Sequence, residues 1–105
     1  MAITHNQLIA PKLLTASATA QYTVGTGIKT QVRALSVANT TAAPVALKLW
    51  LGSGATDANL VENKTLAAGE TYLCIYAINQ ILRAGDKITA QGLGLSIMAS
   101  GAEIS

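Results

Sequence analysis

Glycine spacing is the feature that most constrains the fold of this chain of 105 residues. Nine glycines recur along the sequence and divide it into short segments rich in small and β-branched residues, a pattern typical of strands joined by turns. Helices would need apolar positions every three or four residues with charged faces between them, and charged residues make up only 11% of the chain. The sequence therefore predicts an all-β protein.

The clearest strand covers Val45–Leu51. Its aliphatic residues at positions 45, 47, 49 and 51 fall on one face, while Lys48 and Trp50 fall on the other. A loop of turn-forming residues, Asn39–Pro44, precedes it, and residues 30–38 alternate in the same way. We expect these two segments to form an antiparallel hairpin.

Further strands are predicted on both sides of this pair. Thr71–Ala77 is apolar on both faces, Asp86–Gln91 and Leu93–Ser100 are expected to form a second hairpin, and residues 77–83 form either strand or a single helical turn. Weaker strand patterns cover residues 13–17, 21–24 and 60–66. Together they predict six to eight short strands in an antiparallel β-sandwich or a small jelly-roll-like barrel. The domain would span residues 13–100, with an N-terminal arm at 1–12 and a C-terminal tail at 101–105.

Composition narrows the class of protein. Half of the residues are hydrophobic and the net charge is only +2, which is the reverse of a disordered chain. No uninterrupted apolar stretch approaches the length of about 18 to 20 residues that a membrane-spanning helix needs, so no membrane partner is expected. The seven basic residues are scattered rather than gathered in a stripe, and nucleic acid is therefore not expected as a partner either.

Residues for catalysis or metal binding are scarce. The chain has one histidine, His5, and one cysteine, Cys74, which are too few for a catalytic triad or a zinc site. Cys74 is interpreted as a small buried hydrophobe, and the acidic residues at positions 57, 62, 70, 86 and 103 as solvated turn residues. We expect no enzymatic activity, no cofactor and no metal. Polar residues interrupt the N-terminal apolar stretch, so no signal peptide is predicted.

Surplus apolar surface is the feature that points to function. The strands at 45–51 and 72–77 are apolar on both faces, although a sandwich strand needs only one such face. Large exposed apolar patches mark contact surfaces, so we expect the chain to bind copies of itself, as a dimer or trimer, through a candidate interface. The residues of that interface are Trp50, Lys48, Tyr72 and Tyr76. The alternative is that the aromatic side chains stack on a carbohydrate or another surface.

Two sequence stretches, LSVANTTAAPVALKLWL and LVENKTLAAGETYLCIYAINQILRAGDKITAQGLGLSIMASGAE, consist of strand patterns separated by turn-forming residues. Their order of turns and strands resembles that of small β-sandwich structural proteins of tailed-phage virions. The resemblance covers residues 20–103. It implies a non-enzymatic virion component, made in the host cytoplasm, that decorates or cements the capsid or forms part of the neck or tail. Its partners would be itself and other virion proteins such as the major capsid or tail proteins.

Overall fold

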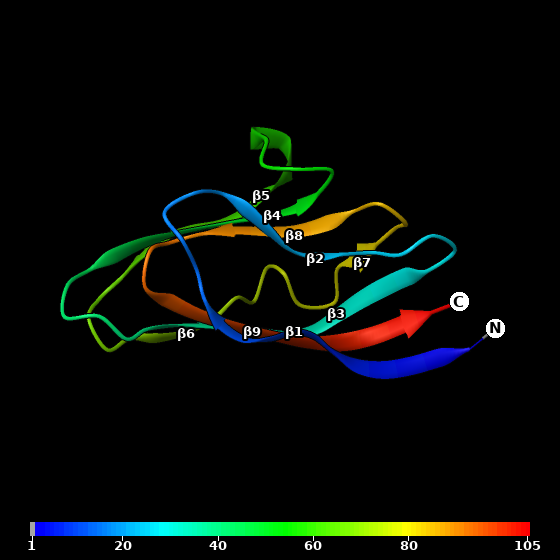
Figure 1. Cartoon of the computed structure of the whole chain (residues 1–105), viewed down its shortest axis with the longest axis horizontal. Coiled ribbons are helices and arrows are strands. Elements are labelled where there is room, and N and C mark those ends of the chain that lie inside the picture. The colour runs from blue at the N-terminus through cyan, green and yellow to red at the C-terminus, as the bar shows by residue number, and fades with distance from the viewer. Residues whose placement is uncertain (1) are drawn as a thin grey trace.

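A computed structural model describes residues 2–105 as two antiparallel sheets packed face to face (Figure 1). The first sheet has the order β1-β9-β3-β6, with β7 also paired to β3, and the second has the order β2-β8-β4-β5. The elements are β1 (Ile3–Leu13), β2 (Thr19–Thr23), β3 (Lys29–Asn39), β4 (Val45–Gly52), the short 3-10 helix η1 (Asp57–Asn59), β5 (Leu60–Leu66), β6 (Thr71–Leu73), β7 (Ile81–Leu82), β8 (Lys87–Gln91) and β9 (Leu95–Ile104). The all-β sandwich is confirmed, with nine strands among the described residues instead of six to eight.

Both chain ends belong to the first sheet. β9 lies between β1 and β3, and the backbones of Ala2 and Ser105 exchange hydrogen bonds of 3.1 and 2.9 Å. The predictions of an arm at 1–12 and a tail at 101–105 are therefore wrong for the described residues, and Met1 lies outside them. The alternation of β1 is weak because its two buried residues, Leu8 and Ile9, are adjacent at an irregularity in its pairing with β9. Gly101 permits the close approach of β9 to β3, because a Cβ there would collide with the carbonyl oxygen of Gln31.

The two predicted hairpins are also wrong. β3 and β4 lie in different sheets, and so do β8 and β9, which means that each connecting loop crosses from one layer to the other. Asn39 braces the first crossing: its side-chain amide donates to the carbonyl oxygens of Ala43 and Leu66 at 2.9 and 3.0 Å. A strand entering either sheet turns one apolar face inward, so alternation is the same for a hairpin and for a crossing.

Aliphatic side chains from both sheets fill the space between the layers. Leu47 and Leu49 of β4 are fully buried there, which confirms the inward face predicted for that strand. Cys74 is also fully buried, as expected of a small hydrophobe, and burial raises its pKa to about 12. The other large buried aliphatic side chains in this cluster are Leu8, Ile9, Leu14, Val24, Val32, Leu35, Val37, Leu66, Leu82, Ile88, Leu95 and Ile97.

An interrupted strand forms one edge of the first sheet. The predicted strand at 71–77 ends at Leu73, where the chain leaves β3, and the chain returns as β7 instead of forming a helical turn at 77–83. The amide of Cys74 donates to the carbonyl oxygen of Leu35 in β3, and further along the amide of Asn79 donates to the carbonyl oxygen of Val32 in the same strand. Figure 1 draws this stretch as the irregular trace between β6 and β7. The interruption prevents another strand from pairing along this edge.

Candidate docking surface

A tight turn at Cys74–Ala77 presents two large apolar side chains to solvent. The amide of Ala77 donates to the carbonyl oxygen of Cys74 at 3.0 Å, which places Ile75 and Tyr76 at the two central positions. Cys74 and Ala77 are fully buried, whereas Ile75 and Tyr76 are 56% and 63% exposed. Central turn positions are ordinarily taken by Gly, Pro, Asn, Asp or Ser, so the backbone geometry of the turn does not account for Ile75 and Tyr76 at these positions.

The chain following the turn is held firmly against β3. The amide of Asn79 donates to Val32 at 2.6 Å, and the amide of Val32 donates to Gln80 at 3.0 Å. The Gln80 side chain donates to the carbonyl oxygen of Tyr76 at 3.2 Å, and Asn79 takes a left-handed φ of 69°, which Asn tolerates better than most residues. The turn is therefore fixed by hydrogen bonds on its C-terminal side and by buried residues within it.

Two more exposed apolar side chains extend this surface. Leu73 of β6 and Ile81 of β7 are both about half exposed, and with Ile75 and Tyr76 they form what we call the apolar strip. The twelve residues from Thr71 to Leu82 contain no charged side chain. Exposed apolar residues are ordinary when single, but a charge-free group of four on one stretch is typical of a contact surface.

An open groove of about 430 Å³ adjoins the strip. Its lining mixes apolar and polar side chains from the end of β4, the loop that carries η1, the start of β5, and β7. They include Leu51, Ser53, Asn59, Val61, Ile81 and Asp86. Asp86 is the charged residue of the lining, and its Oδ2 accepts a hydrogen bond from the amide of Arg83 at 2.9 Å. Ile81 belongs to both the groove lining and the strip.

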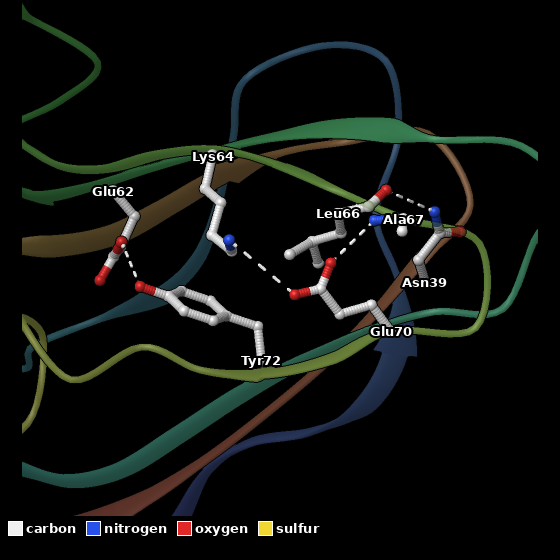
Figure 2. Close-up of polar contacts among 7 residues, drawn as sticks. All are labelled: Asn39, Glu62, Lys64, Leu66, Ala67, Glu70 and Tyr72. Carbon is white, nitrogen blue, oxygen red and sulfur yellow. Dashed lines mark hydrogen bonds and ion pairs between the residues drawn. The ribbon is translucent and has the colours of Figure 1, made fainter.

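A group of polar side chains, which we call the latch, joins the two sheets at the edge formed by β5 and β6 (Figure 2). Tyr72 of β6 donates its hydroxyl to Glu62 Oε1 of β5 at 3.0 Å, and so joins the edge strands of the two sheets. The Lys64 ammonium lies 5.2 Å from the centre of the Tyr72 ring and 3.9 Å from Glu70 Oε2. Burial, and then the bond to the Glu62 carboxylate, raise the pKa of the Tyr72 hydroxyl to about 12.

Glu62 and Glu103 are the acidic residues that sequence reasoning wrongly placed in turns, since they lie in β5 and β9, and Glu62 is the one at this site. It is only 5% exposed, and its Oε2 is buried with no hydrogen-bond partner among the described residues. Its interpretation as a solvated turn residue is wrong because it lies inside β5, two residues from Lys64 and four from Leu66 on the inward face. That spacing of two was the available signal, since positions 62, 64 and 66 share one face of a strand.

The four residues predicted as an interface do not form one patch. Tyr72 points inward to the latch, and Trp50 is only 7% exposed although it lies on the other face of β4 from Leu49. The loop carrying η1 projects on the outer side of this sheet, and η1 contacts β4 (Figure 1). Lys48 is exposed on β4, and Tyr76 is exposed on the turn. Of the four, only Tyr76 belongs to the apolar strip.

The described residues contain neither a metal site nor a membrane-spanning helix. Within residues 2–105, no three side chains of His, Cys, Asp or Glu gather in a way that would hold a metal ion. None of the helical structure in that range is long and apolar enough to cross a membrane. Comparisons with protein-family models, with curated proteins and with solved structures returned no match.

Proposed function

We propose that this chain is a non-enzymatic structural protein of a tailed-phage virion, which self-associates and decorates or cements the capsid or forms part of the neck or tail. The single observation that carries the proposal is the apolar strip. It is a fixed stretch of exposed apolar side chains, with no charged residue of its own, on a small sandwich where the fold itself has no need of large apolar side chains. The resemblance of the turns and strands to virion proteins supplies the setting.

The alternative of a carbohydrate-binding module depends on exposed aromatic side chains that form a platform. Trp50 is covered and Tyr72 is turned toward Glu62, which leaves Tyr76 as the well-exposed aromatic of the three. One ring without a neighbouring ring is a poor sugar platform, so we retain self-association as the proposed function.

Two measurements test the proposal. Light scattering of the purified protein at micromolar concentration should give a mass above 10.8 kDa, because the strip is covered when copies associate. Antibodies against the chain should label gradient-purified particles of the phage that encodes it. A monomer at every concentration would contradict self-association, and particles without the chain would contradict a place in the virion.

A further inference from the structure

We infer that two copies of this chain form a twofold dimer in which the Ile75–Tyr76 turn of each copy docks into the groove between β7 and the η1 loop of the other. This inference deepens the proposed function and depends on it, since it names the surface through which the chain self-associates. The occupant of the groove is a second copy of the same chain.

The groove and the turn have matching chemistry. Tyr76 has an apolar ring and a polar tip, and the groove offers apolar walls from Leu51 and Val61 beside the polar groups of Ser53 and Asp86. Asp86 has its Oδ2 occupied by an amide, which leaves Oδ1 as an acceptor for a phenolic hydroxyl. A groove of about 430 Å³ is within the size range of sites that enclose ligands larger than one side chain.

Charge favours a copy of the same chain as the partner. In a twofold contact each surface meets itself, so any cluster of like charge would be repelled. The residues from Thr71 to Leu82 carry no charge, and the charged lining residue of the groove, Asp86, would face the uncharged turn of the partner. The docked turn therefore brings no charge of its own against Asp86.

The strip and the groove are both needed to bury enough surface in the dimer. A standard interface removes about 800 Å² per partner from water, and a fully buried aromatic side chain accounts for about 150–250 Å². Four side chains that are each about half exposed supply well under that total, so contact between strips alone would be small. Reciprocal docking adds the walls of the groove on each copy, and Ile81 belongs to both the groove lining and the strip.

The turn is suited to docking because it is already ordered. Its hydrogen bonds to β3 and the buried Cys74 and Ala77 fix the backbone before a partner arrives. Binding then loses the rotamer freedom of the two exposed side chains but little backbone freedom.

The first test compares two exposed apolar residues of equal accessibility. Tyr76→Asp places a charge in the docked turn without disfavouring the turn itself, and we expect the dimer dissociation constant to rise at least tenfold by analytical ultracentrifugation. Leu93→Asp is the matched control, because Leu93 is 66% exposed in the turn between β8 and β9, away from the strip and groove. Its dissociation constant should equal that of the unmodified chain.

The second test locates the contact. Copies carrying Ile75→Cys are mixed with copies carrying Ser53→Cys, and mild oxidation should yield a disulfide-linked pair containing one of each. The native Cys74 is fully buried and does not compete. Copies carrying Ser17→Cys, in an exposed bend outside the groove, replace the Ser53→Cys copies as the control and should not be linked.

The outcomes separate the two proposals. An oligomer that Tyr76→Asp leaves intact, or linking that is equal with the Ser17→Cys control, overturns the docking of the turn while self-association stands. A chain that is monomeric before any substitution overturns both. Weakening by Tyr76→Asp together with linking only through position 53 supports the dimer as described.

Discussion

Removal of a single oxygen atom tests the latch between the sheets. Tyr72→Phe deletes the hydroxyl that donates to Glu62 at 3.0 Å and keeps the ring, so the contact between the ring and Lys64 remains. Glu62 is 5% exposed, and its Oε2 already lacks a partner among the described residues. After the substitution neither of its oxygens would have a side-chain donor, in a place where water reaches poorly.

The size of the effect follows from that burial. A hydrogen bond to a charged group contributes about 1.5–3 kcal/mol, so we expect Tyr72→Phe to lower the free energy of unfolding by about 2 kcal/mol. With an unfolding entropy of about 2.1 cal/mol/K per residue, a 105-residue chain gives about 0.22 kcal/mol/K, and the melting temperature should fall by about 9 °C. The double variant Glu62→Leu/Tyr72→Phe should recover most of this loss, because apolar groups then replace both partners.

The double-mutant cycle compares the unmodified chain, Tyr72→Phe, Glu62→Leu and the double variant. Urea unfolding of these four proteins, at equal protein concentration, measures the coupling energy between Tyr72 and Glu62. Ser17→Ala is the control, since it removes the hydroxyl of an exposed residue outside the strip and the groove and should change the free energy of unfolding by less than about 0.5 kcal/mol. Equal effects of Tyr72→Phe and Ser17→Ala would refute the reasoning. So would a double variant whose loss equals the sum of the two single losses.

Two further predictions concern the packed interior. In urea unfolding, Trp50→Ala should lower the free energy of unfolding by about 3–5 kcal/mol, because Trp50 is covered. Lys48→Ala should lower it by less than about 0.5 kcal/mol, because Lys48 is exposed. Similar losses for the two variants would place Trp50 in solvent. Folding raises the pKa of Cys74 from 9.0 and the pKa of Tyr72 from 10.0, each to about 12. The stability that these two groups contribute is therefore present below about pH 9 and is lost as the pH rises to 12. A urea midpoint that stays constant from pH 8 to 12 would contradict this prediction.

Several of the strands were predictable from the sequence, although the strand predicted at 13–17 is loop beyond Leu13. Leu60–Leu66 forms β5 with the predicted bounds, and the strand predicted at 45–51 is β4 with one more residue. Both lie between turn-forming residues, and alternation is a property of a few neighbouring positions. Local chemistry is sufficient for predictions of that kind.

The pairing of strands was not predictable in the same way. β3 and β4 lie in opposite sheets, and the Asn39 side chain that braces this crossing bonds to Leu66, which is 27 positions along the chain, so no local pattern reports the contact. The edge position of β1 depends likewise on β9 at the far end of the sequence. Glu62 and Tyr72 form their latch only because these crossings bring β5 and β6 to the same side.

The site was half predictable for a related reason. The apolar patterns of the strands at 45–51 and 72–77 predicted surplus apolar surface and placed part of it on Trp50, which the rest of the chain covers. The exposed excess lies instead where the strand predicted at 71–77 breaks, since the break turns Ile75 and Tyr76 outward. Leu93 shows that one exposed apolar residue in a turn is tolerated. Four on a charge-free stretch beside a groove would leave that surface in water unless something covers it, and burial of apolar area is the force that would bring the proposed second copy there.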